Sequence, residues 1–447
     1  MPADVGVVHR RPAGEQVRPG GSRLLVVGAV VAAVAAVAYL IAVATHPMND
    51  TLKGFDLQVY LGGAHEAIHH QGSLYTWIYN GNPGIQFTYT PFAALVFTAG
   101  HALSFKALMV LVTIVSIVAL VGGVWIAFRE LGWQGSARLG ATLLVSGLVF
   151  WTEPVQRELF LGQVELVLMG LITWDICQPD SRPWKGAMTG VLAGIDLIPG
   201  IYILYLIVTR RFRQAAVAAG AFVVTVLIGF AALPHASVTW WLHGDFFQAS
   251  RTGFVGDQQN QSLRGLLTRL IGTVNGAQAP WLVLALIVGL AGLAAAVILD
   301  RRGYTFAGFM AVALTGLLVS PISWDHHWVW IAPGLAVLID AAVRAGRAGR
   351  PALRNAWYAL AAAVLIVFAA WPEFWKAKAG LLGGGLINYA PASSFAHGDN
   401  PNYFEYHWHG LQLIAGNLEL LAGLGLFVIV LVVAFSLGKS LRRPAGA

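Results

Sequence analysis

Charged residues are scarce in this chain. Only 11% of its 447 residues are Asp, Glu, Lys or Arg, whereas a soluble globular domain carries roughly 25%. Hydrophobic residues make up 57% of the chain, and the mean hydropathy is +0.67. This composition excludes an ordinary water-soluble protein and indicates an all-α polytopic membrane protein.

Cysteine is almost absent. Cys177 is the single cysteine and lies within an apolar run, so the chain can form no internal disulfide. The net charge of +7 does not indicate a nucleic-acid partner either. The basic residues gather in short loops between apolar runs, which is a signal of membrane topology rather than of a binding patch.

Twelve apolar runs of near-spanning length predict about 12 transmembrane helices. They lie at 23–44, 91–104, 107–127, 139–152, 160–178, 187–208, 214–233, 279–300, 304–320, 327–345, 353–371 and 411–438. The runs 91–104 and 139–152 are shorter than the ~20 residues of a straight span. They are tilted, re-entrant or buried by protein, and the side on which Glu153, Arg157 and Gln163 lie therefore stays open.

Positive charge gives the orientation. Basic residues in the short loops fall on the side of both termini, which marks that side as cytoplasmic; they include the N-terminal arginines, Lys106, Arg210, Arg211, Arg213, Arg301, Arg302, Arg344 to Arg354, Lys439, Arg442 and Arg443. We expect disordered cytoplasmic tails at 1–22 and 439–447, one transmembrane domain at 23–438, and external loops at 45–90, 234–278 and 372–410.

The stretch GFDLQVYLGG, residues 54–63, follows the first apolar run. Asp56 and Tyr60 are four residues apart and share one face of the short interfacial helix that we predict here. A carboxylate at this depth can act as a general base toward an acceptor hydroxyl. A helix cap or a solvated loop charge is the plainer interpretation of Asp56.

The stretch SPISWDHHWVW, residues 320–330, places His326 and His327 between Trp324 and Trp328. A metal site would need further ligands at helical spacing, and the sequence has none nearby. The histidines are either structural or donors to a phosphate leaving group.

The stretch NQSLRGLLTRL, residues 260–270, predicts a short amphipathic helix. Asn260, Gln261 and Ser262 lead into it, as polar N-terminal caps do. Arg264 and Arg269 follow, and arginine matches phosphate geometry. They hold either a substrate phosphate or ordinary anionic headgroups.

These stretches, together with FTYTPFAALVF and FLGQVELVL, occur in an order that resembles glycosyltransferase family 87 of the GT-C superfamily. The resemblance covers about 23–345, and more loosely the chain to 438. It implies an integral-membrane enzyme that uses a polyprenyl-phosphate sugar, with an essential acidic residue in the first external loop, where Asp56 stands. Two residues depart from the pattern: Glu165 stands where asparagine is expected, and Asp196 where lysine is expected.

The resemblance also implies a reaction. We expect mannose to move, with inversion, from polyprenyl-phosphate-mannose to the fifth position of a phosphatidylinositol mannoside, in α-1,2 linkage. Asp56, His326 and His327 are the predicted catalytic residues. The predicted substrate-binding residues are Tyr60, Asn260, Gln261, Ser262, Arg264, Arg269 and Trp324. No metal and no cofactor is expected, because one cation or imidazolium can stabilise a monophosphate leaving group.

The expected location is the plasma membrane, with the active site facing outward and the sugar donor, a glycolipid acceptor and membrane lipids as partners. Within the enzyme class, the alternative is a mannosyl- or arabinosyltransferase of lipomannan or lipoarabinomannan. Outside that class, the alternative is a transporter or flippase of lipid-linked sugars. Carriers usually place ionisable groups near the middle of the membrane, and the apolar runs here contain few apart from Asp175 and Asp196.

Overall fold

The computed structural model describes residues 21–45, 52–70, 72–82, 85–370, 385–393 and 398–439. The predicted tails therefore lie almost wholly outside the described residues, as do parts of the external loops 45–90 and 372–410. In the described ranges the protein is all-α and contains no strand, only three isolated bridges. The all-α prediction is confirmed.

Six helical segments are long and apolar enough to cross a membrane: α1 (Gly21–Thr45), α5 (Phe105–Glu130), α11 (Phe212–Ala232), α14 (Val274–Arg301), the segment Asp325–Arg347 that joins η7 (Asp325–Trp330) to α16 (Ile331–Arg347), and α19 (Leu418–Lys439). A seventh candidate is the pair α7 (Glu153–Leu161) and α8 (Glu165–Ile176), which is bent by 113°. The count of about twelve spans is not confirmed by helix length.

The remaining helices are shorter. They are α3 (Phe55–His69), α4 (Pro91–Thr98), α6 (Gly135–Val149), α9 (Ala187–Ala193), α10 (Ile201–Val208), α12 (Pro234–Ser237), α13 (Leu263–Ile271), α15 (Thr305–Val319), α17 (Pro351–Val367) and α18 (Leu411–Ala415). Single turns of 3₁₀ or π helix are η1 (Tyr79–Gly81), η2 (Ala99–Ala102), η3 (Ile198–Gly200), η4 (Val238–Leu242), η5 (Asp245–Phe247), η6 (Ala249–Thr252), η8 (Leu386–Tyr389) and η9 (Phe404–His407).

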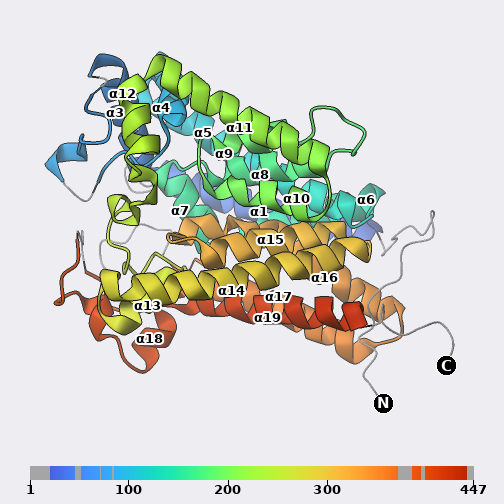
Figure 1. Cartoon of the computed structure of the whole chain (residues 1–447). Helices are drawn as coiled ribbons and strands as arrows, with labels where there is room; N and C mark the ends of the chain where they lie inside the picture. The colour runs from blue at the N-terminus through green and yellow to red at the C-terminus, as the bar shows by residue number, and fades with distance from the viewer. Residues whose placement is uncertain are drawn as a thin grey trace.

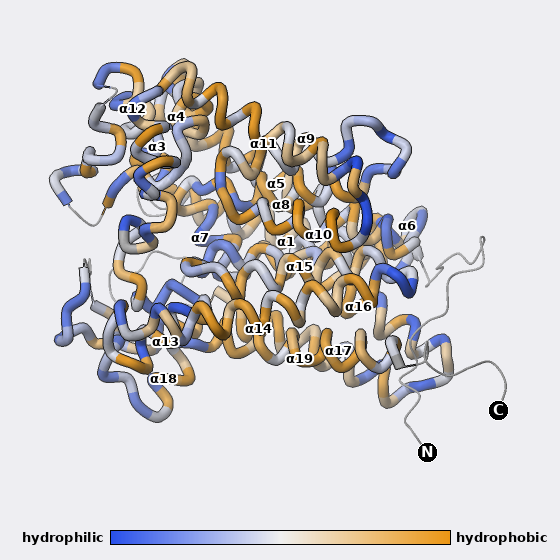
Figure 2. The backbone as a smooth tube through the Cα atoms, viewed as in Figure 1, coloured by the Kyte–Doolittle hydropathy of each residue, from blue (hydrophilic) through white to orange (hydrophobic). Residues whose placement is uncertain are grey.

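The long helices run side by side from one end of the molecule to the other (Figure 1). The middle of the helices is mostly hydrophobic, and hydrophilic residues gather at both ends of the bundle (Figure 2). One end holds α3, α12, α13 and α18, and the described chain begins in α1 and finishes in α19 at the other (Figure 1). Large apolar side chains such as Val34 and Leu290 are exposed on the outside of the bundle, as expected for a surface that faces lipid.

The predicted span 91–104 does not cross the membrane. Its helical stretch is α4 continued by the four residues of η2, so it is about 20 Å long, against the ~30 Å of a hydrocarbon core. A Cβ on Gly100 would lie 2.7 Å from Leu61 of α3, and one on Gly54 would lie 2.7 Å from Phe105. Just before the segment, the Tyr89 ring lies edge-on to Tyr60 of α3, with 4.9 Å between ring centroids. The segment therefore begins and ends beside α3.

Lys106 consequently lies at the α3 end and not with the other basic loops. It is the second residue of α5, directly after Phe105, which contacts the start of α3. The prediction that placed Lys106 on the side of the termini is wrong, because it counted 91–104 as a crossing.

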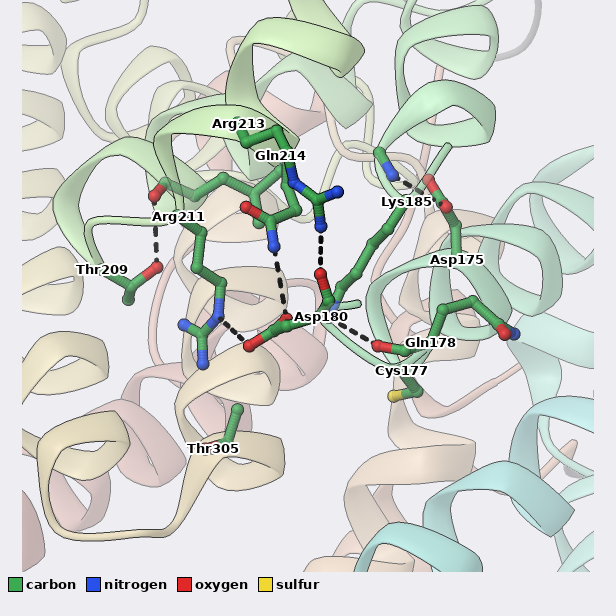
Figure 3. Close-up of polar contacts among 12 residues, drawn as sticks. Asp175, Cys177, Gln178, Asp180, Lys185, Thr209, Arg211, Arg213, Gln214 and Thr305 are labelled. Atoms are coloured by element: carbon green, nitrogen blue, oxygen red, sulfur yellow. Dashed lines mark hydrogen bonds and ion pairs between the residues drawn. The ribbon is translucent and has the colours of Figure 1, made fainter. Parts of the chain in front are cut away.

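The predicted span 187–208 is a re-entrant hairpin of α9, η3 and α10. Lys185, just before it, donates to Asp180 at 2.8 Å, and Arg211 and Gln214, just after it, also contact Asp180. Figure 3 shows these side chains converging from different segments. The helix is interrupted after Gly194, where a Cβ would meet Thr225 at 2.0 Å.

The bend between α7 and α8 answers the question that the sequence left open for 139–178. Gly162 adopts the left-handed conformation that such a turn requires, with φ 72°. A Cβ on Gly162 would lie 3.0 Å from Leu57. The bend, and Gln163 with it, therefore lies beside α3.

Candidate functional site

A cavity of about 1720 Å³ opens at the α3 end of the bundle. Drug-sized pockets are roughly 300–1,000 Å³, so this cavity has room for more than one small ligand. Its polar lining comes from α3, α7, α13, η7 and the loops between them; it includes Asp56, Tyr60, Glu153, Gln156, Arg157, Gln163, Asp196, Asp245, Arg251, Asp257, Gln258, Gln259, Arg264, Trp324, His326, His327 and Asn388.

Asp56 lies in the first turn of α3, where the helix dipole favours a carboxylate. Gly54 turns the chain into this helix with φ 58°, and its backbone N–H donates to the carbonyl oxygen of Phe160 at 2.8 Å. The Gln163 amide donates to Asp56 Oδ2 at 2.7 Å. No hydrogen bond to Oδ1 occurs within the described residues, so that oxygen is available to a ligand in the cavity.

Burial raises the pKa of the Asp56 carboxyl above its usual value. The His326 ring, the Gln163 amide and the Arg157 guanidinium oppose this rise, and Asp325 adds to it. The carboxyl is thus a stronger base than a solvated aspartate. This is how a site prepares a carboxylate to take a proton near neutral pH.

Tyr60 and Tyr89 fix the amide of Gln163. The Tyr60 hydroxyl donates to Gln163 Oε1, and it also lies 3.1 Å from the Tyr89 hydroxyl. Burial raises the pKa of Tyr60 well above its usual value, so its hydroxyl stays protonated. Because the amide oxygen faces these hydroxyls, the amide nitrogen must face Asp56. The shared helix face predicted for Asp56 and Tyr60 is confirmed.

Asp325 holds His326 in place. Its Oδ1 accepts from the backbone N–H of His326 at 2.7 Å and lies 3.2 Å from His326 Nδ1. Its Oδ2 accepts from Arg157 Nε at 3.2 Å. His326 is 4% exposed, and its Nε2 is buried without a partner in the described chain. The ring therefore lines the cavity with one nitrogen held by Asp325 and the other buried without a partner in the described residues.

His327 and Trp324 also line the cavity. The His327 ring stands edge-on to His326, with 4.7 Å between ring centroids. Trp324 pairs with Asn260 in an isolated antiparallel bridge, which joins η7 to the loop before α13. The predicted stretch 320–330 thus forms one wall of the cavity.

Arg264 provides an unneutralised cation at the cavity. The side chain is 8% exposed, and its guanidinium lies 5.0 Å from the Trp281 ring centroid. It forms no ion pair with any described residue, and burial lowers its pKa. A buried guanidinium without a carboxylate partner is a natural anion site.

Arg269, Asn260, Gln261 and Ser262 do not line the cavity. Arg269 donates to Asn417 Oδ1 at 2.6 Å and to the backbone oxygen of Asp257 at 2.7 Å. The other three side chains are fully buried and bond to backbone, as in the Gln261 contact to the Gly416 oxygen at 2.8 Å and the capping bond from the Gly265 N–H to Ser262 at 3.1 Å. These contacts favour a structural role, and substrate binding by the four residues stays a prediction.

The cavity continues into the bundle as an apolar groove. Its lining there comes from α10, α14 and α15; it includes Ile201, Leu204, Leu282, Gly289, Leu293, Gly316 and Val319. Leu204 and Leu282 are about half exposed, at 51% and 52%. The groove therefore opens sideways, toward the surface that faces lipid.

Sequence reasoning missed the cavity residues Arg157, Gln163 and Asp257, and the role of Asp325, which lies behind His326 and does not line the cavity. Gln163 is 107 positions from Asp56, and Arg157 is 168 from Asp325, so no local pattern joins them. A polar cluster directly after the short run 139–152 was the available signal. Among the described residues, no three His, Cys, Asp or Glu side chains are placed to hold a metal, and metal independence stays a prediction.

The cavity is lined by Asp56, by His326, which Asp325 orients, and by Arg264, and it continues into an apolar groove that opens toward lipid. Such a site is suited to an enzyme that acts on lipid-linked substrates. Glycosyltransferase family 87 matches residues 87–321, more than half of the chain, and the protein belongs to that family. It is therefore a membrane glycosyltransferase.

Curated relatives are similar over much of their length. A polyprenol-phosphate-mannose-dependent alpha-(1-2)-phosphatidylinositol pentamannoside mannosyltransferase of Mycobacterium tuberculosis (strain CDC 1551 / Oshkosh) is 36% identical over 68% of this chain and 70% of its own. The enzyme of the same name from Mycolicibacterium smegmatis is 35% identical over 68% of this chain and 74% of its own. A polyprenol-phosphate-mannose-dependent alpha-(1-2)-phosphatidylinositol mannoside mannosyltransferase of Mycobacterium tuberculosis (strain ATCC 25618 / H37Rv) is 33% identical over 57% and 62%. No solved structure matches the chain.

The two residues that depart from the family pattern lie against each other. Glu165, at the start of α8, and Asp196, in the break of the re-entrant hairpin, are close enough for their carboxyl groups to interact. Asp196 lines the large cavity, and Glu165 lies behind it, 5% exposed. The two departures therefore form one local change rather than two.

Proposed function

We propose that the protein transfers mannose from polyprenyl-phosphate-mannose to a phosphatidylinositol mannoside, in α-1,2 linkage, on the outer face of the plasma membrane. The observation that carries the proposal is the cavity that has Asp56, His326 and Arg264 in its walls and continues into an apolar groove. The relatives' names support the donor and acceptor. Membership of an enzyme family disfavours the transporter alternative.

In the proposed step, the acceptor 2-hydroxyl oxygen attacks the anomeric carbon of mannose. Its proton passes to Asp56 Oδ1, the oxygen left free by Gln163. The bond from the anomeric carbon to the phosphate oxygen breaks, and polyprenyl phosphate leaves with the electron pair. One in-line displacement converts a β-linked donor into an α-linked product.

The leaving phosphate needs positive charge, and two groups can supply it. Arg264 has no carboxylate partner among the described residues, and His326 has a free Nε2. Because Asp325 holds Nδ1 of His326, Nε2 can donate to a phosphate oxygen when the ring is protonated. Fixed donors aimed at developing charge act without reorganisation.

The groove and the basic loops support the membrane placement. The prenyl chain would lie along α10, α14 and α15, where the lining is apolar. The end opposite the cavity carries the basic loops that contain Arg211 and Arg302, which is the distribution of a cytoplasmic side. The cavity would then face outward.

The test is mannosyl transfer by purified protein in detergent, with polyprenyl-phosphate-mannose and a tetramannosylated phosphatidylinositol. Asp56→Asn should lower kcat by about 10²–10⁴-fold, the range typical of losing a general base, while binding both substrates. Turnover by Asp56→Asn at the wild-type rate would remove Asp56 from that role. Loss of wild-type transfer on adding chelator would refute metal independence.

Glu66→Gln is the matched control, because Glu66 lies on the same helix and outside the cavity. Its carboxylate accepts from Ser73 at 2.7 Å. This variant should transfer mannose at the wild-type rate. If the wild type uses the donor but prefers mannan acceptors, the family assignment stands and the proposed acceptor does not.

A further inference from the structure

Two buried amides in the cavity wall carry oxygen atoms that have no donor among the described residues. Gln156 and Gln258 are 4% and 7% exposed, and both line the cavity. Neither Gln156 Oε1 nor Gln258 Oε1 has a hydrogen-bond partner within the described chain. A buried carbonyl oxygen without a donor costs about 1–3 kcal/mol, so a ligand that supplies donors is the natural explanation.

Neighbouring groups fix the direction of the Gln156 amide. Its nitrogen donates to the backbone oxygen of Phe150 at 2.5 Å. A carbonyl oxygen only accepts, so the nitrogen of Gln156 must face it and Oε1 must face away. The free atom at this position is therefore an acceptor.

A chain of hydrogen bonds fixes Gln258 in the same way. Asn388 Nδ2 donates to Glu153 Oε1 at 3.2 Å, which leaves Asn388 Oδ1 to accept from Gln258 Nε2 at 2.8 Å. Gln258 Oε1 is then the end of the chain. Since Glu153 and Gln156 are three residues apart on α7, the two free oxygens belong to one wall.

We propose that this wall, built by Gln156, Gln258 and Asn388, is a subsite for a neutral sugar whose hydroxyl groups donate to the two free amide oxygens. Glu153 and Asp257 line the cavity with them and, together with Asp325, balance the charge of Arg157, which follows Gln156 on α7; a wall without net positive charge favours a neutral ligand over a phosphate. Trp324, whose backbone bridges to Asn260 two residues after Gln258, also lines the cavity, and aromatic side chains pack well on sugar rings. The subsite differs from the cation-rich region around Arg264, and its assignment to sugar rests on the proposed function.

The sugar has two possible sources, the mannose of the donor and the non-reacting sugars of the acceptor. Kinetics with each substrate varied in turn distinguishes them. In Gln258→Met and Gln156→Met, we expect KM for one substrate to rise about 3- to 10-fold, the effect of one neutral hydrogen bond, with kcat little changed. Gln214→Met is the matched control, because Gln214 is a buried glutamine beside Asp180, at the other end of the protein.

Deoxy analogues of the affected substrate distinguish sugar binding from a structural role, because a structural role would not make KM depend on one particular hydroxyl group. An analogue that lacks the hydroxyl bound by Gln258 should raise KM for the wild type and add no further rise in Gln258→Met. Additive losses, or unchanged KM for both substrates in both variants, would overturn the subsite.

Binding of methyl α-mannoside, followed by tryptophan fluorescence, keeps this proposal separate from the catalytic one. Weaker binding by both variants than by Gln214→Met supports the subsite even if the wild type fails to transfer mannose. Equal binding by all three variants, with wild-type transfer intact, refutes the subsite alone.

Discussion

At the scale of single residues, two carboxyl groups have different surroundings, one in the cavity wall and one behind it. Asp56 receives one hydrogen bond and leaves an oxygen free. In Asp325, one carboxylate oxygen contacts His326 and the other accepts a hydrogen bond from Arg157. The first arrangement suits a group that takes a proton, and the second suits a group that holds another side chain in position.

The pH dependence of kcat/KM should reflect the ionisation of the Asp56 carboxyl. Because burial raises its pKa, the acid limb of kcat/KM should lie above the ~4 of an ordinary carboxyl group. A general base works only when deprotonated, so activity should fall as pH drops through this raised pKa. The measurement is kcat/KM across the acid and neutral range. Asp257 titrates nearby, and Asp257→Asn should leave the limb in place; a limb that moves with that variant would contradict the assignment to Asp56.

Asp257 should cost stability at neutral pH. Burial raises its pKa to about 6, above the ~3.9 of the unfolded chain. The carboxyl therefore costs nothing below the unfolded pKa; its cost grows as pH rises from about 4 to about 6 and stays constant above that. Asp257→Asn keeps the acceptor for the Gln259 N–H and should be more stable than wild type at neutral pH by roughly 3 kcal/mol, because raising the pKa from ~3.9 to about 6 corresponds to that free energy.

Thermal unfolding in detergent at two pH values measures this difference. The gap between Asp257→Asn and wild type should close as the pH approaches 4, about the unfolded value. A gap of the same size at both pH values would show that the substitution acts through packing and not through ionisation.

At the scale of helices and turns, η7 is tied to α7 by one buried ion pair, Asp325 with Arg157. The Asp325 side chain has no exposed surface. Asp325→Asn should destabilise the protein by about 3 kcal/mol, because it leaves a partly buried cation unpaired. Glu130→Gln breaks the exposed pair with Arg129 and should cost less than about 1 kcal/mol. Equal shifts in unfolding temperature would contradict the pairing.

Helix composition predicted much of the fold and left 91–104 open as tilted, re-entrant or buried by protein, but it did not predict the re-entrant hairpin at 187–208. The interfacial helix that carries Asp56 and the amphipathic helix after Ser262 were both predicted and are present as α3 and α13. The segments 91–104 and 187–208 are apolar because they pack on protein on one side and leave side chains such as Val96 and Leu204 exposed on the other, and hydropathy does not distinguish such a hairpin from a full crossing. The partners of Asp56 could not be predicted, since they are more than 100 residues away in sequence.

At the scale of the whole molecule, chemical labelling can test the topology in which 91–104 does not cross the membrane. Cys177 is the single cysteine, so Cys177→Ser gives a background without thiols. Lys106→Cys and His69→Cys should react with a membrane-impermeant maleimide from the same side, because both residues are exposed at the α3 end. Arg182→Cys, in the loop between α8 and α9, should react only from the opposite side. Labelling of Lys106→Cys together with Arg182→Cys would restore 91–104 as a crossing.

The sideways opening of the groove between Leu204 and Leu282 has a kinetic consequence. A substrate that enters from the bilayer reaches the enzyme by diffusion in two dimensions, and its effective concentration is its mole fraction among the lipids. Diluting the donor with inert lipid or detergent at constant bulk concentration should then slow the reaction. Rates for this protein are comparable only at equal surface density of substrate.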